Sequence, residues 1–183
     1  RSPKWQAGDR VLVNGYGLSE RHWGAYAQKQ RVNADFLVRI PEVFSSELAM
    51  AIGTAGYTSM LAVNAIRDHG TQPADGPVLV TGGAGGVGSV AIMLLAKLGY
   101  EVVASTGRPE TAAYLKSLGA KDTIARSELA RAAKPLEKEL WAACVDSVGS
   151  TTLATALAQL RYNGVVAACG LAGGGDLPST VMP

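Results

Sequence analysis

The sequence has 183 residues, of which 48% are hydrophobic and 17% are charged. These proportions are typical of a folded globular chain with a substantial core and exclude intrinsic disorder. Its 17 Lys and Arg residues and 15 Asp and Glu residues give a net charge of +2 and form no basic run. Nothing in the composition therefore requires a nucleic-acid or membrane partner.

Targeting and metal-binding signals are also missing from the sequence. No apolar run reaches the roughly 18 residues that span a bilayer, and residues 1–5 lack the apolar core of a signal peptide, which predicts a cytoplasmic protein. Cys144 and Cys169 each fall in an expected central strand, which predicts buried, reduced thiols. His22 and His69 lie apart from any cysteine pair, so the zinc-ligand spacing is absent and we expect no metal site in this chain.

Residues 1–45 contain short apolar stretches separated by turn-forming residues. They predict antiparallel strands at residues 11–13, 23–27, 31–32 and 36–38. Three or four short strands are few for an independent domain, so this segment predicts part of a β-barrel.

Two helices are expected before the first long strand. Ser45 and Ser46 can cap one helix, and Thr54 can cap a longer one over residues 55–69. The longer helix is mostly apolar and should pack into the core. Polar groups near its start, such as Tyr57, either pack structurally or line a cleft.

A short β-branched run at residues 78–81 passes directly into glycines and then into an apolar helix at residues 87–98. Gly83, Gly85 and Gly88 have the spacing G-x-G-x-x-G, and the strand before and helix after them indicate a dinucleotide site. The first glycine allows a tight turn, the second allows the backbone to approach a pyrophosphate, and the third allows the helix to pack on the sheet. The N–H groups at the start of this helix would face the diphosphate. A glycine-rich turn without a ligand is the alternative.

Strands and helices alternate at intervals of about 20 residues from Val78 onward, which is typical of a right-handed parallel βαβ series. We therefore expect an α/β protein with a Rossmann fold, a doubly wound parallel sheet. The usual sheet of this fold has six strands, and the chain provides five before an expected loop at residues 170–183. The expected strands cover residues 78–81, 101–105, 122–125, 142–147 and 165–169, and the expected helices between them cover residues 87–98, 109–119 and 151–160.

The end of the second of these strands decides which dinucleotide fits, because the ribose with the 2′ oxygen lies there. An NAD site usually has Asp or Glu at this point, whereas this chain has Ser105, Thr106 and then Arg108. Hydroxyls and a guanidinium suit a 2′-phosphate, so the sequence predicts NADPH. In the expected strand order Arg126 ends the neighbouring strand and adds a second cation, and Leu171, past the fifth strand, could contact the nicotinamide.

These motifs resemble those of the zinc-independent medium-chain dehydrogenases and reductases, in the quinone-oxidoreductase-like branch. Within that branch the chain is most similar to the bacterial acrylyl-CoA reductase group, and the likeness covers essentially its whole length. The similar segments are residues 53–58, 78–88, 105–108, 114–120, 135–138 and 169–174.

The resemblance implies a GroES-like catalytic domain split around a Rossmann domain. Residues 1–45 would be a part of the catalytic domain, and residues 46–183 would be the NADP-binding domain without its last strand, so the chain would be an internal fragment. NADPH would reduce the conjugated C=C of a small enoyl thioester such as acrylyl-CoA. By position, the residues implied to hold the diphosphate are Ala84, Gly85, Gly86 and Val87, those on the 2′-phosphate side are Thr106, Gly107, Arg108 and Arg126, and Leu171 lies on the nicotinamide side.

Two other functions stay open at this point, a quinone reductase that uses the same hydride donor and a nucleotide-binding fragment without catalysis. The family further implies a small-molecule substrate and a homodimer in the full-length parent. The proton donor is unassigned. Tyr16, His22 and Tyr57 are polar groups in segments that could border the cleft, and structural packing is the alternative role of each.

Overall fold

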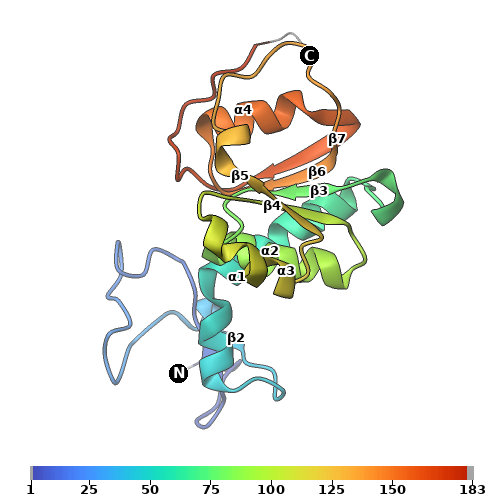
Figure 1. The fold of residues 1–183 in the computed structure, drawn as a ribbon. Coiled ribbons are helices and arrows are strands. Elements are labelled where there is room, and N and C mark those ends of the chain that lie inside the picture. Colours follow the sequence, from blue (N-terminus) through green and yellow to red (C-terminus); the bar gives the residue numbers. More distant parts are fainter. Residues whose placement is uncertain (1, 181–183) are drawn as a thin grey trace. The chain divides into compact units, whose positions relative to one another are not determined.

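A five-stranded parallel sheet is the centre of the larger of two units in this protein (Figure 1). The computed structural model describes residues 2–180. The units are Arg1–Thr54 and Ala55–Pro183. Residues 181–183 of the expected C-terminal loop lie outside the described residues.

The first unit contains little regular structure. β1 (Val11–Leu12) pairs antiparallel with β2 (Val38–Arg39), and a 3-10 helix, η1 (Ala34–Phe36), precedes β2. Residues 23–27 and 31–32 form no strand, so the prediction of strands there is wrong.

Local side-chain contacts replace strand pairing in this part of the first unit. The Asn33 side chain accepts a hydrogen bond from the Asp35 N–H (3.0 Å) and so starts η1. The ring of Phe36 stacks on Tyr16 with 4.1 Å between the centroids. A short segment extends only where another strand pairs with its backbone groups, and such a partner is absent from the described residues here.

Helix α1 (Ser46–Asp68) contains the two helices that the sequence predicts, separated by a kink at Gly53 (φ 49°, ψ −160°). The Ser45 hydroxyl accepts a hydrogen bond from the Leu48 N–H (3.1 Å) and caps the first helix as expected. The hydroxyl of Thr54, the expected cap of the second helix, donates to Asn14 Oδ1 (2.8 Å).

By length and composition alone, α1 could cross a membrane. It is interrupted at Gly53, and Val63 and Ile66 on its second half are fully buried in the core of the second unit. Packing in that core accounts for the apolar character of this half of the helix.

The sheet of the second unit has the order β5-β4-β3-β6-β7, and all its neighbouring strands are parallel. In chain order this is 3-2-1-4-5, which confirms the predicted Rossmann topology. The strands are β3 (Val78–Val80), β4 (Val102–Thr106), β5 (Asp122–Ala125), β6 (Trp141–Asp146) and β7 (Leu160–Ala168). The α-helices between them are α2 (Gly86–Lys97), α3 (Ala112–Ser117) and α4 (Ser150–Ala158). Three 3-10 helices complete this unit: η2 (Pro73–Asp75) precedes β3, η3 (Pro109–Thr111) precedes α3 and η4 (Arg126–Glu128) follows β5.

Helices cover both faces of this sheet, with α2 and α3 on one face and α4 on the other (Figure 1). The side chains of β3 explain why, since all three are fully buried and alternate between the faces. Val78 and Val80 pack with Ile92 of α2, whereas Leu79 packs with Leu129 and with Trp141. Strands buried on both faces require this doubly wound arrangement.

The two cysteines differ in their surroundings. Cys144 is fully buried in β6, and burial raises the pKa of its thiol well above the ordinary range. Cys169 is exposed and follows β7, which is an edge strand of the sheet, so its prediction as a buried central-strand residue is wrong. Both thiols are free, as the sequence predicts.

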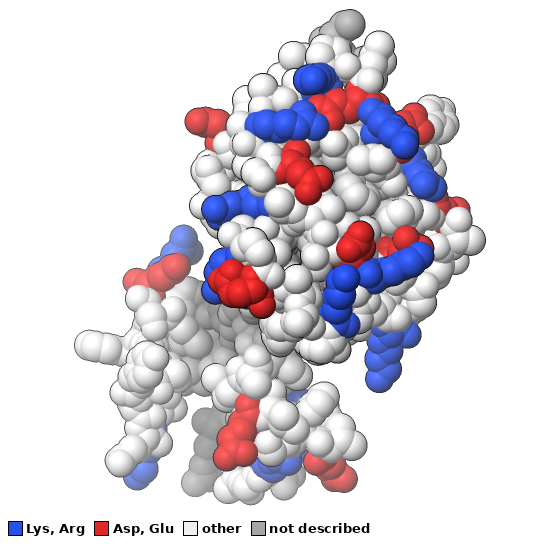
Figure 2. Space-filling model, in the orientation of Figure 1, with Lys and Arg blue, Asp and Glu red and all other residues white. Residues whose placement is uncertain are grey.

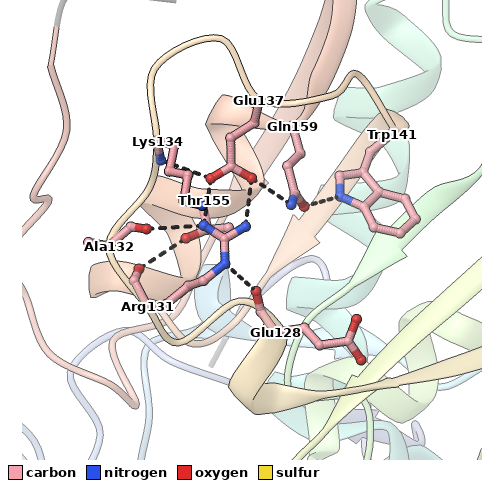
Figure 3. Close-up of polar contacts among 8 residues, drawn as sticks. All are labelled: Glu128, Arg131, Ala132, Lys134, Glu137, Trp141, Thr155 and Gln159. Atoms are coloured by element: carbon pink, nitrogen blue, oxygen red, sulfur yellow. Dashed lines mark hydrogen bonds and ion pairs between the residues drawn. The ribbon is translucent and has the colours of Figure 1, made fainter.

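An ion pair holds the irregular connection between β5 and β6 (Figure 3). Arg131 donates to Glu137 through both terminal nitrogens, with distances of 2.5 and 2.6 Å. Gln159, at the end of α4, donates to the same carboxylate (2.9 Å) and accepts from the Trp141 indole N–H (3.0 Å). We call Arg131, Glu137, Gln159 and Trp141 the crossover clip. It joins the connection to both α4 and β6.

The free energy of unfolding should depend on the charge of Glu137. The Arg131 guanidinium holds the pKa of this carboxyl at about 2, below its ordinary value of 4.5, against the opposing effect of burial. Because the folded-state pKa is the lower one, the stabilisation is complete above about pH 4.5 and is lost as the pH falls towards about 2. Glu137→Gln should lower the free energy of unfolding by about 1 to 3 kcal/mol at pH 7, and by less than half as much near pH 3, in urea titrations.

The matched control is Glu101→Gln, which removes an ion pair with Lys121 (2.6 Å) whose side chains are 41% and 67% exposed. It should change the free energy of unfolding by less than about 0.5 kcal/mol at both pH values, because exposed pairs contribute little. An equal effect of Glu137→Gln at pH 7 and pH 3 would contradict the role given to the carboxylate charge.

Candidate functional site

A cleft of about 540 Å³ lies beyond the carboxyl ends of the parallel strands. In a doubly wound sheet this is the edge where ligands bind, at the point where the strand order reverses. The lining residues include Gly82, Ala84 and Gly85 after β3, Thr106, Gly107 and Arg108 after β4, Arg126 and Ala130 after β5, residues 147–152 after β6, and Ala172 and Gly173 after β7.

The turn after β3 is tight, as the glycine motif predicts, but the residue with the left-handed backbone is not the one expected. Gly82, which is outside the G-x-G-x-x-G spacing, has the left-handed backbone (φ +60°). Gly83 donates its N–H to the Ser105 carbonyl (2.9 Å) and so ties the turn to β4. At Gly88 a Cβ would overlap the carbonyl oxygen of Gly82 and lie 2.7 Å from the Cα of Gly83, so the third glycine allows α2 to approach the turn.

Helix α2 begins directly after this turn. Gly85 is its N-cap and provides no side-chain hydrogen bond. The first N–H groups of the helix are therefore left for another acceptor, and the helix dipole favours an anion there. Ala84 and Gly85 line the cleft, whereas Gly86 and Val87 begin the helix behind them.

The loops after β4 and β5 each bring one cation to the cleft, Arg108 and Arg126. The Thr106 hydroxyl accepts the Arg108 N–H (3.1 Å), and the Arg108 side chain reaches across to the carbonyl of Ala84 (3.4 Å). The guanidinium carbon of Arg126 lies 2.7 Å from the point that a Cβ on Gly107 would occupy. Among the described residues neither guanidinium forms an ion pair, so both charges are available to an anion.

A buried polar pair lies behind the cleft, between the ends of β3 and β6. The Thr81 hydroxyl donates to Asp146 Oδ1 (2.6 Å) and accepts the Ser147 N–H (3.1 Å), and both Thr81 and Asp146 are fully buried. Asp146 also accepts the N–H of Gly149 (2.8 Å) and so fixes the loop that lines the cleft after β6. The sequence analysis missed this loop, although its position after a parallel strand was a usable signal.

Other expected site residues lie elsewhere. Leu171 is 72% exposed and lines a smaller neighbouring hollow of about 260 Å³. Tyr16 and His22 belong to the first unit and face the ring of Phe36. Tyr57 is exposed on α1 and is not among the residues that line the cleft.

The charged residues that line the cleft are both basic, Arg108 and Arg126. On the face drawn in Figure 2, acidic and basic side chains are interspersed. Within residues 2–180 no group of three or more His, Cys, Asp or Glu side chains is arranged to hold a metal ion.

The strand order, the glycine turn after β3 and the cleft beyond the strand ends together define a Rossmann-type domain. A family model described as zinc-binding dehydrogenase matches residues 86–183. The chain belongs to this family.

Similar proteins agree with this assignment. The chain is 58% identical over 181 residues to the acrylyl-CoA reductase AcuI of Ruegeria pomeroyi, covering 98% of this chain and 55% of that protein. The solved structure of the yhdH oxidoreductase from Salmonella enterica in complex with NADP is 54% identical, with a TM-score of 0.95 over 98% of this chain and 55% of that one.

A third similar protein is Bacillus subtilis yhfP, whose curated name assigns it provisionally to the quinone oxidoreductases. Its structure with NAD bound is 43% identical, with a TM-score of 0.95 over 99% of this chain and 55% of that one. The resemblance to the acrylyl-CoA reductase group and its quinone-oxidoreductase-like branch is confirmed. The chain spans about half the length of these relatives.

Gly88→Ala should destabilise the second unit, because the added methyl group would meet the backbone of Gly82 and Gly83 and neither can move like a side chain. We expect a loss of about 1 to 3 kcal/mol in the free energy of unfolding, measured in urea. Gly175→Ala is the control, since a Cβ there meets no atom within 4 Å. Equal stability of the two variants would show that the turn is looser than described.

Proposed function

We propose that this protein is an NADPH-dependent oxidoreductase that reduces the conjugated C=C bond of a small enoyl thioester such as acrylyl-CoA. The substrate class is supported by the 58% identity with the acrylyl-CoA reductase of Ruegeria pomeroyi. The observation that carries the cofactor proposal is the pair of Arg108 and Arg126, which line one cleft beside Thr106 and Gly107 and form no ion pair in the described chain.

The cleft fits a dinucleotide with a 2′-phosphate. At the ends of β4 and β5 the cleft offers the Thr106 hydroxyl and the guanidinium groups of Arg108 and Arg126, where an NAD site offers a carboxylate. Arg108, Arg126, Thr106 and Gly107 would hold the 2′-phosphate side.

The other half of the cofactor would lie along the glycine turn. A Cβ at Gly83 would come within 3.1 Å of the Ala104 Cβ, and one at Gly85 within 3.2 Å of the Gly82 oxygen, so glycines at these positions let the turn pack tightly on itself and on β4. The diphosphate would bind along residues 84–87, where the start of α2 offers N–H groups, and the nicotinamide would lie towards Leu171.

The cofactor supplies the hydride for the β-carbon of the alkene. The chain's own contribution is to bind and orient, through the turn after β3 and the two arginines. Reduction also needs a proton for the α-carbon. We assign no residue to that step.

From the same resemblance we propose several properties of the whole protein. Residues 1–45 would be a part of a GroES-like catalytic domain, and residues 46–183 would belong to the NADP-binding domain. A small-molecule substrate, a cytoplasmic location and a homodimer complete this proposal.

A quinone reductase is the second candidate function, favoured by the curated name of the 43% identical protein yhfP. Oxidation of NADPH, followed at 340 nm, should give a higher kcat/KM with acrylyl-CoA than with 1,4-benzoquinone. A higher value with the quinone would favour the second candidate. Tight NADPH binding without turnover of either substrate would favour a nucleotide-binding module without catalysis.

Arg108→Ala should weaken NADPH binding by about 10- to 100-fold and leave NADH binding nearly unchanged, because a charge-assisted contact to the 2′-phosphate contributes about 1.5 to 3 kcal/mol. Arg126→Ala should act in the same direction with a smaller effect. The measurement is a fluorescence titration with each cofactor.

Arg161→Ala is the matched control for these two variants. Arg161 is an exposed arginine near the start of β7, at the opposite end of the strands, and its guanidinium donates to the Asp75 carbonyl (2.5 Å). Removing it should leave both cofactor affinities unchanged. If Arg108→Ala weakens NADPH and NADH equally, the assignment of this loop to the 2′-phosphate is wrong.

A further inference from the structure

The connection between β5 and β6 contributes two residues to the cleft, Arg126 and Ala130, and then continues without regular structure as far as Trp141. The Arg126 carbonyl accepts the N–H groups of Leu129 (3.1 Å) and Ala130 (2.8 Å). On its other side Arg126 follows Ala125, which pairs with Thr106 in the sheet. The position of Arg126 therefore depends both on the end of β5 and on where residues 129–131 are held. Leu129, which is 1% exposed, is one anchor, and Arg131 is the other.

Arg131 binds both the beginning and the end of this connection (Figure 3). Its Nε donates to the Glu128 carbonyl (3.0 Å) within η4, and its terminal nitrogens donate to the Glu137 carboxylate. The planar guanidinium fixes these directions together, because its donors form a rigid fork. The turn that carries Arg126 is thus tied to residue 137.

The clip is fixed in turn to well-buried parts of the second unit. Thr155, fully buried on α4, donates its hydroxyl to the Arg131 carbonyl (3.1 Å). Gln159 and Trp141, 8% and 7% exposed, connect Glu137 to the end of α4 and the start of β6. Glu137 therefore joins the Arg131 side chain to the buried residues at the end of α4 and the start of β6.

We propose that Glu137 is a positioning residue for Arg126, and that the crossover clip sets the preference of the cleft for ligands with a 2′-phosphate. The inference rests on the proposed function, in which Arg126 faces that phosphate. The Arg126 guanidinium has no ion-pair partner among the described residues, so no carboxylate holds it over Gly107. Its placement comes from a backbone that the end of β5 holds on one side and the clip on the other.

Two nucleotides that differ only by the 2′-phosphate test this role, 2′,5′-ADP and 5′-AMP, titrated calorimetrically against the chain at pH 7. Glu137→Gln should weaken 2′,5′-ADP by about 2- to 30-fold, the range for residues that act through a network. It should weaken 5′-AMP by less than about 2-fold. Arg126→Ala should show the same selectivity, and Glu101→Gln, which breaks the exposed pair with Lys121, should change neither affinity.

The affinities of these variants distinguish a failure of the role given to Glu137 from a failure of the proposed cofactor site. If Arg126→Ala is selective and Glu137→Gln weakens both nucleotides equally, or neither, the clip is structural only and the inference is overturned. If Arg126→Ala is not selective, the assignment of Arg126 to the 2′-phosphate is wrong, and the inference fails with it.

Arg131→Lys provides a milder variant should Glu137→Gln not fold. It keeps the positive charge beside Glu137 and loses the fork that reaches Glu128. Its selective loss for 2′,5′-ADP should be smaller than that of Arg126→Ala but measurable. An unchanged ratio of the two affinities in Arg131→Lys would also overturn the inference.

Discussion

The parallel pairing of β3 with both β4 and β6 is the constraint on which the cleft depends. Val80 is in register with Ala104 on one side and Val145 on the other, so the three strands end within two residues of the same level. Thr81, Ser105 and Asp146 are the next residues, and the loops that follow them line one cleft. The strands can hold this register because their side chains are buried on both faces of the sheet.

Buried polar groups at the strand ends fix the conformation of the loop after β6 that lines the cleft. Thr81 uses its hydroxyl both as donor to Asp146 and as acceptor from Ser147 N–H. The Asp146 carboxylate then holds Gly149, whose left-handed backbone (φ +75°) starts α4. A buried carboxylate is costly without donors, so each of these contacts must be kept. The apolar strands set the position of the cleft, and the polar pair sets the course of its β6 loop.

The parts that the sequence predicted well depend on local patterns and on one rule of topology. Strand order, the glycine turn and the placement of Arg108 and Arg126 along one cleft all follow once alternating strands and helices are placed in a Rossmann sheet. The contact between Thr81 and Asp146 joins residues 65 positions apart, and nothing in the spacing of either indicates it. The strands expected at residues 23–27 and 31–32 failed for a related reason, because short apolar stretches become strands only beside a partner.

The ion pair of the crossover clip also provides hydrogen-bond partners for the backbone between β5 and β6. The connection after β5 is irregular, so its carbonyl and N–H groups lack the partners that a helix or strand would supply. Arg131 satisfies the carbonyls of Glu128 and Ala132, and Glu137 satisfies the Lys134 N–H. An apolar pair of the same size could fill the space and leave these groups unpaired. Glu137 also compensates the positive charge of Arg131. In this connection Arg126, and not Arg131, is therefore the cation that an anion in the cleft would meet.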